Sequence, residues 1–153
     1  MSASLNQAVT AADVAAARAT LTRTHGVYQR ANLPMSVDID LTYRCDLDCD
    51  HCYLENKDTW PEMTNREWRS ALEQIRDLGA VQLGWSGGEV FARADFPELI
   101  ALAGSMGFLS VVKTHGGNVT QERARLLADS GVYRVDVSVY SLNDQIHDAI
   151  TRV

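Results

Sequence analysis

The three cysteines of this 153-residue chain, Cys45, Cys49 and Cys52, fall within one eight-residue segment. Their C-x3-C-x2-C spacing follows residues 37–41, in which Val, Ile and Leu alternate with Asp. Three thiolates so close together cannot all pair as disulfides, and a shared inorganic centre can use all of them. A four-thiolate site would need a fourth cysteine, which the chain lacks. Three thiolates on a cubane of four irons leave one iron open to a small molecule.

Two other uses of these cysteines stay open. The first is a zinc ion held by the three thiolates and His51, although His51 lies between two of its proposed co-ligands and would strain the loop. The second is three ordinary reduced cysteines, although such residues are usually scattered along a chain. The spacing favours an iron–sulfur cluster over both.

A second motif, Ser86-Gly87-Gly88-Glu89, follows an apolar segment at residues 81–85 that is typical of a short strand. Glycines at a strand end let the backbone approach a ligand closely, because no Cβ intervenes. The carboxylate of Glu89 can accept hydrogen bonds from an ammonium group. By itself, Gly-Gly after a strand is more often only a turn. The motif becomes informative because it follows the cysteine segment by one strand and one helix.

Strands and helices are expected to alternate from residue 35 onward. Strands are predicted over 36–42, 81–85, 108–113 and 133–139, and helices over 65–78, 96–106, 120–130 and from about residue 142. This order predicts an α/β fold of parallel strands with right-handed crossovers. An Ala-rich helix, predicted over residues 8–24 and ended by Gly26, precedes these units.

The predicted strands have one apolar and one polar face. Polar residues at every second position of 36–42 and 133–139 break the apolar pattern that strands buried on both faces usually show. The polar face therefore either contacts water or lines a cavity. A cavity is favoured, because both motifs follow the C-terminal ends of strands, where α/β folds build their sites. Candidates to face a substrate there are Asp38, Asp40, Asp136 and Tyr140.

Composition narrows the class of partner. A net charge of −6 without a basic stripe argues against nucleic acid. No apolar run approaches the ~18 residues that a membrane span needs, and the N-terminal residues lack the pattern of a secretion signal. Cysteines without such a signal indicate the reducing cytoplasm.

The two motifs together resemble those of the radical S-adenosylmethionine (radical SAM) superfamily, whose members carry C-x3-C-x2-C after the first strand and Gly-Gly-Glu after the second. The resemblance covers about residues 35 to 150. The flanking residues Leu41-Thr-Tyr-Arg-Cys45 and Cys52-Tyr53, and the run 95–100, are similar to the SPASM-type branch, which matures peptides and proteins.

This resemblance implies a domain organisation. Residues 1–34 would form an N-terminal helical extension, and residues 35–153 a radical SAM core that is incomplete at its C-terminus. The fold implied is a partial (β/α) barrel, with four βα units present of an expected six. Because the sheet would end at an unpaired fourth strand, these residues alone are expected to be poorly soluble or oligomeric.

The resemblance also implies the cofactors and their ligands. Cys45, Cys49 and Cys52 would ligate three irons of a 4Fe–4S cluster, and SAM would chelate the fourth iron through its amino and carboxylate groups. The SAM-binding residues that it implies are His51, Tyr53, Gly87, Gly88, Glu89 and Ser138. The two glycine carbonyls and the glutamate would meet the methionine ammonium, and the histidine would lie beside the adenine. Packing under the loop stays the alternative for the tyrosine, and an ordinary strand position the alternative for the serine.

Two departures from the family pattern stand out. Relatives commonly carry Thr-Asn-Gly where this chain has Thr114-His115-Gly116. His115 is a candidate proton donor there, and a structural histidine is the alternative. Relatives often place an arginine near the end of this segment to reach the SAM carboxylate, and Arg152 is only a loose substitute for it.

The activity implied is reductive cleavage of SAM to methionine and a 5′-deoxyadenosyl radical that abstracts hydrogen from a substrate. A peptide or protein side chain is the substrate expected first, with an electron donor such as flavodoxin or ferredoxin. One alternative is a radical SAM enzyme of tetrapyrrole or other small-molecule biosynthesis. The other is a truncated, non-catalytic module that binds a cluster or a peptide.

Overall fold

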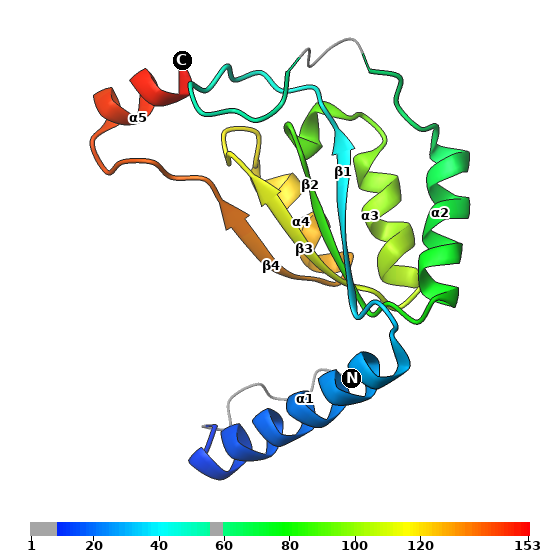
Figure 1. Ribbon diagram of the computed structural model, residues 1–153. Coiled ribbons are helices and arrows are strands. Elements are labelled where there is room, and N and C mark those ends of the chain that lie inside the picture. Colours follow the sequence, from blue (N-terminus) through cyan, green and yellow to red (C-terminus); the bar gives the residue numbers. More distant parts are fainter. Residues whose placement is uncertain (1–8, 56–59) are drawn as a thin grey trace.

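The computed structural model describes residues 9–55 and 60–153 (Figure 1). Its strands are β1 (Ser36–Thr42), β2 (Gln82–Gly87), β3 (Leu109–Thr114) and β4 (Val132–Val137). Its helices are α1 (Ala11–Ala31), α2 (Asn65–Asp77), α3 (Phe96–Ser105), α4 (Gln121–Asp129) and α5 (Asp144–Thr151), with a short 3₁₀ helix, η1, at Val90–Ala92. Within the described ranges the strands form one sheet in the order β1-β2-β3-β4, and every neighbouring pair is parallel. The predicted α/β fold with alternating strands and helices is confirmed.

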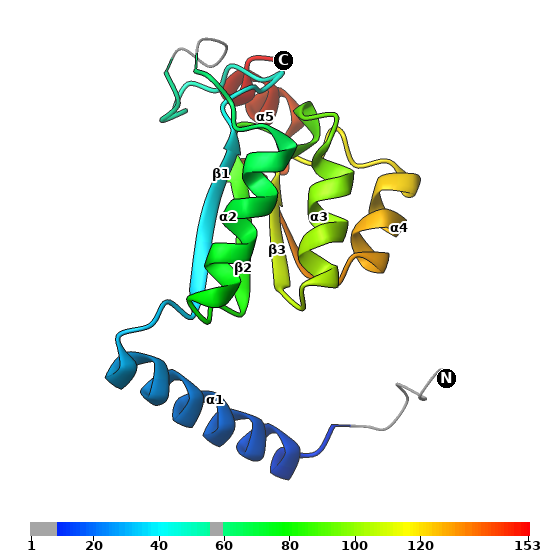
Figure 2. The same cartoon turned by 90° about the vertical axis from the view of Figure 1, so that its right-hand side faces the viewer.

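Helices α2, α3 and α4 lie together on one face of the sheet (Figures 1 and 2). Apolar residues of that face pack against the helices, and each fully buried Leu, Ile or Phe side chain contributes about 1.5–3 kcal/mol of transfer free energy. The side chains that form this core include Ile39, Leu83, Trp85 and Val112 from the strands and Leu72, Phe96, Leu99, Ile100 and Leu127 from the helices. The helical face of the sheet therefore holds the fold together.

Helix α1 differs from its prediction. It continues through Gly26 to Ala31 and ends at Asn32, which adopts a left-handed conformation with φ 54°. One glycine inside a helix costs only about 1 kcal/mol, whereas a left-handed Asn is a common helix end. α1 buries none of its residues, and the hydroxyl of Tyr28 donates to the carbonyl of Gly79 at 2.6 Å. The helix lies beyond the N-terminal ends of the strands, away from their C-terminal rim (Figures 1 and 2).

The opposite face of the sheet carries polar side chains, as the alternation predicts. Asp38 lies across Gly84, where an added Cβ would come within 2.1 Å of the Asp38 Oδ1 atom. Lys113 on β3 donates to the same oxygen at 3.2 Å, so an ion pair crosses β2 above this glycine. In the described part of the chain, no helix covers this face (Figure 2).

Strand β4 departs from the expected helix-covered pattern. Val135 and Val137 are 39% and 51% exposed, although their counterparts on the inner strands are buried. The strand ends at Val137, and Val139 beyond it is 60% exposed. The physical reason is the position of α5, which lies by the C-terminal rim of the sheet and not along β4 (Figure 1). Val132 at the start of the strand still packs against the core, whereas the apolar face from Val135 onward lacks a covering helix within the described residues.

Candidate functional site

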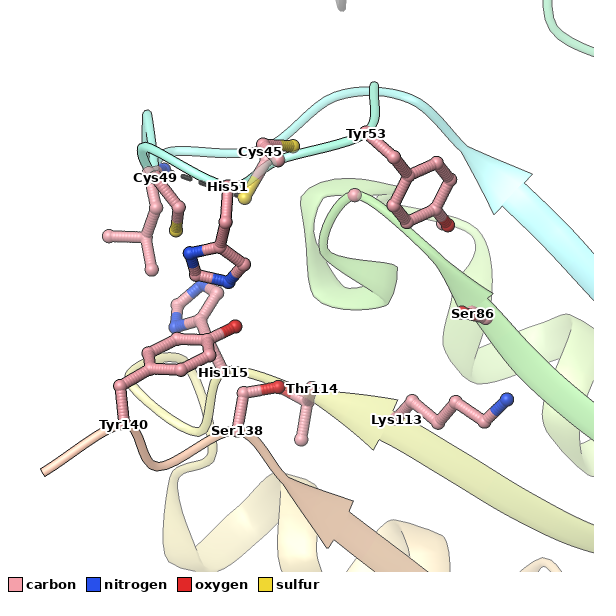
Figure 3. A pocket seen from close by; sticks show the side chains of 14 residues that line it. Cys45, Cys49, His51, Tyr53, Ser86, Lys113, Thr114, His115, Ser138 and Tyr140 are labelled. Carbon is pink, nitrogen blue, oxygen red and sulfur yellow. Dashed lines mark hydrogen bonds between the residues drawn. The ribbon is translucent and has the colours of Figure 1, made fainter. Parts of the chain in front are cut away.

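The C-terminal ends of the four strands meet at one rim, because all neighbouring strands are parallel. A cavity of about 290 Å³ opens at this rim (Figure 3). The cysteines, the two glycines, His51, Tyr53 and Ser138 line it, as does the substrate candidate Tyr140. Glu89 and the substrate candidates Asp38, Asp40 and Asp136 do not line it. The lining is Cys45, Leu47, Cys49, His51, Cys52, Tyr53, Ser86, Gly87, Gly88, Lys113, Thr114, His115, Ser138 and Tyr140. The structure thus brings both sequence motifs to one place.

The cysteine loop, residues 43–55, connects the end of β1 to the segment before α2. Cys45, Cys49 and Cys52 are all half-buried, and the side chains of Cys45 and Cys49 lie near His51 at the edge of the cavity (Figure 3). The loop is folded by its own backbone, because the Cys52 N–H donates to the Cys49 carbonyl at 3.0 Å. The Leu47 N–H donates to the sulfur of Cys45 at 3.5 Å. The thiolate is the form of cysteine that binds metal.

Helix α5 contacts the cysteine loop from outside the cavity. The Asp50 N–H donates to the Ile150 carbonyl at 3.0 Å. Arg152, just after α5, donates to Asp50 at 2.6 Å and to Asp48 at 3.3 Å. The guanidinium is therefore engaged with the loop, and Arg152 does not line the cavity where a SAM carboxylate was expected.

Gly87 and Gly88, at the end of β2, are required because residues 42–44 pass directly over them. The Gly88 N–H donates to the Thr42 carbonyl at 2.7 Å. A Cβ on Gly88 would lie 2.2 Å from the Arg44 carbonyl oxygen. Gly87 has φ +117°, and its Cβ would lie 2.2 Å from the Thr42 carbonyl oxygen. Residues with a side chain would therefore push the start of the cysteine loop away from β2.

Glu89 is fully buried, with 0% exposure. Its Oε1 accepts from the Phe91 N–H at 3.1 Å, and its Oε2 accepts from the Thr114 hydroxyl at 2.8 Å and the His115 N–H at 3.1 Å. The imidazole Nε2 of His115 also lies 3.2 Å from Oε2 of Glu89. These contacts join the end of β2 to the end of β3. Direct contact between this carboxylate and an ammonium group stays a prediction.

His115 has partners that the sequence did not indicate. Its Nε2 lies 2.9 Å from the Oδ1 of Asp46, a residue of the cysteine loop. Burial would raise the pKa of Asp46, but hydrogen bonds from His115 and Asn118 lower it below its ordinary value. The carboxylate is therefore ionised at neutral pH. The sequence does not single out Asp46, because this residue belongs to no motif of its own and gains its role only from contacts with the turn after β3.

An aromatic group forms the other wall of the cavity. The rings of His51 and Tyr140 meet edge to face with centroids 4.4 Å apart, and His147 of α5 stacks on Tyr140 with centroids 5.8 Å apart.

Tyr53 also lines the cavity. Burial and the Asp40 carboxylate raise the pKa of Tyr53, although its hydrogen bond with Ser86 acts in the opposite direction. The phenol is therefore a neutral donor at pH 7.

Ser138 lies just beyond β4, and its N–H donates to the Thr114 carbonyl at 3.0 Å. Its side chain points to the cavity beside Thr114 (Figure 3).

Among residues 9–55 and 60–153, no helix has the length and apolar character to cross a membrane.

Comparisons with solved structures place this architecture among known folds. SuiB of Streptococcus suis, bound to its precursor peptide SuiA, aligns with a TM-score of 0.71, 19% identity and 100% of this chain. BtrN in complex with AdoMet and 2-DOIA aligns with a TM-score of 0.63, 15% identity and 72% of this chain. anSMEcpe with bound AdoMet and a peptide aligns with a TM-score of 0.62, 18% identity and 76% of this chain. At these identities the likeness shows the fold.

The chain spans 35% of the length of SuiB, 47% of BtrN and 34% of anSMEcpe. A comparison with protein families matches residues 39–153 to the radical SAM superfamily. This match includes the cysteine loop, the glycine pair and all strands except the first residues of β1. The chain therefore belongs to the radical SAM superfamily.

Proposed function

We propose that this chain is the cofactor-binding part of a radical SAM enzyme that abstracts hydrogen from a peptide or protein side chain. Membership of the superfamily implies a 4Fe–4S cluster and SAM as cofactors. The observation that carries the proposal is that Cys45, Cys49 and Cys52 line the same cavity as Gly87 and Gly88. Three soft thiolates suit a cluster with one open iron, and glycine backbone beside them suits close approach of a small ligand.

The bound cofactors supply reductive cleavage of SAM to methionine and a 5′-deoxyadenosyl radical, which takes hydrogen from the substrate. The role of the protein is to bind and orient these cofactors. The three cysteines would hold three irons, and the carbonyl groups of Gly87 and Gly88 would accept hydrogen bonds from the methionine ammonium. The carboxylate of Glu89, buried directly behind this segment, favours a positive charge there.

The aromatic wall suits the nucleoside end of SAM. His51, held edge to face by Tyr140, would lie beside the adenine. Tyr53 would be a second contact, and the hydroxyl of Ser138 would bind polar groups of SAM. All four residues line the cavity, which supports these roles.

A peptide substrate is supported by the neighbours and by the polar face. SuiB is described with its precursor peptide, and anSMEcpe with a bound peptide. The face below the cavity carries Asp38, Lys113 and Asp136, which can hydrogen-bond a peptide.

We propose flavodoxin or ferredoxin as the electron donor and the cytoplasm as the compartment. The net charge of −6 opposes nucleic acid as a partner.

A small-molecule substrate is the second candidate, because BtrN has the same fold and is described in complex with AdoMet and 2-DOIA, with no peptide named. The two candidate functions differ only in the class of substrate. They use the same cofactor-binding residues.

Anaerobic reconstitution with iron and sulfide tests the proposal. With dithionite and SAM, the loaded protein is expected to form methionine and 5′-deoxyadenosine in equal amounts, even without substrate. Chromatography of both products is the measurement, and the Cys52→Ala variant gives the background. A loaded protein that forms no more product than this variant would contradict the proposed chemistry.

A further inference from the structure

We propose that His115 is a positioning residue that locks the cysteine loop to the Gly-Gly-Glu segment and thereby sets the affinity for SAM. The part that concerns SAM rests on the proposed function. The lock itself rests only on contacts between residues of this chain.

The orientation of the imidazole is fixed by its backbone neighbour. The Gly117 N–H donates to Nδ1 of His115 at 3.1 Å, which makes Nδ1 the acceptor and places a proton on Nε2. That proton is donated to Asp46 Oδ1 at 2.9 Å, and Nε2 also lies 3.2 Å from Glu89 Oε2. The backbone N–H of His115 donates to the same oxygen of Glu89 at 3.1 Å. The His115 side chain is 13% exposed, so little water competes for these contacts.

The two carboxylates belong to different motifs. Asp46 follows the first cysteine of the loop, and Glu89 ends the Gly-Gly-Glu segment. His115 therefore joins the loop that carries the cysteines to the strand end that carries the glycines, through its imidazole N–H on one side and its backbone N–H on the other. The turn after β3 is built for this contact. Gly116 adopts φ +87°, and its N–H donates to the Thr114 hydroxyl at 3.1 Å.

A second contact supports the lock from the same turn. The side-chain amide of Asn118 donates to Asp46 Oδ2 at 3.2 Å, so residues of the β3–α4 turn hold both oxygens of this carboxylate. Glu89 keeps its bonds from Thr114 and from the His115 backbone when the imidazole is removed. Loss of the ring should therefore loosen the loop without unfolding the sheet.

The matched pair of variants is His115→Ala and His115→Gln. Alanine removes the side-chain donor to Asp46, whereas the glutamine amide nitrogen can occupy the place of Nε2 and donate to the same carboxylate. His25→Ala controls for loss of an imidazole elsewhere, because His25 is exposed on α1.

Hydrogen exchange of residues 43–54 in the cluster-free protein tests the lock without any cofactor. His115→Ala is expected to raise the exchange rate of this segment about tenfold, as loss of one hydrogen bond to a charged group should. His115→Gln and His25→Ala are expected to exchange like the wild type. Equal exchange in the alanine variant, or equal acceleration in the glutamine variant, would overturn the lock.

Calorimetric titration of SAM into the cluster-loaded proteins tests the consequence. His115→Ala is expected to bind SAM about tenfold more weakly at unchanged iron content, and His115→Gln to restore the affinity. Wild-type protein that takes up no cluster would overturn the proposed function, and the exchange experiment would still decide on the lock. Unchanged SAM affinity in the alanine variant, with faster loop exchange, would overturn the role in binding.

Discussion

Replacement of Cys45, Cys49 or Cys52 by alanine, one at a time, is expected to abolish the 4Fe–4S cluster. All three cysteines line the same cavity, and the chain has no other cysteine that could replace one of them. Two thiolates hold a cubane poorly. The fold should survive each replacement, because none of the three cysteines belongs to the hydrophobic core. Iron and sulfide content after anaerobic reconstitution, together with visible absorbance that dithionite bleaches, is the measurement.

The exposed Ser105→Ala, at the end of α3, serves as the control for handling and oxygen exposure. It is expected to load as much iron as the wild type. A cysteine variant that retains a full cluster would show that this cysteine is not a ligand. Loss of cluster in all three variants, with unchanged circular dichroism, agrees with three equivalent ligands.

Replacement of Glu89 by alanine is expected to lower the free energy of unfolding by about 3 kcal/mol. The carboxylate is fully buried and accepts hydrogen bonds from Phe91, Thr114 and His115. Alanine leaves these donors buried without an acceptor. The same change should weaken SAM binding, because it removes the negative charge behind the glycine pair. Denaturant unfolding of the cluster-free protein and calorimetry of the loaded protein measure the two effects.

Glu89→Gln is the matched variant, because it keeps the shape and one acceptor oxygen while it removes the charge. Its stability is expected to lie between those of the wild type and the alanine variant. Equal stability of all three proteins would show that the buried contacts contribute little. SAM affinity that is unchanged in both variants would show that the motif acts only as a turn.

Much of the fold could be predicted from local pattern. The strand expected over 36–42 is β1 itself, because alternating apolar and polar residues define both its length and its faces. Helix α2 begins after Thr64, whose side chain and that of Glu67 cap each other's backbone. Such signals lie within a few residues of the element that they define. The parallel order then brings the strand ends, and with them both motifs, to one rim.

The remaining features depend on contacts between distant segments. Residues of β4 have the same alternation as β1, yet Val135 and Val137 are exposed because α5 packs against the cysteine loop. The contact of His115 with Asp46 joins residues 69 positions apart and has no local signature. The burial of Glu89 follows from the same packing of the β3 end against β2. Sequence could place these residues at the rim but not decide which of them face the cavity.

Electron paramagnetic resonance of the dithionite-reduced protein, recorded with and without SAM, tests the central claim most directly. The account predicts one reduced 4Fe–4S cluster per chain, whose signal changes shape when SAM binds to its open iron. A colourless protein with one equivalent of zinc, or a cluster signal that SAM leaves unchanged, would contradict it.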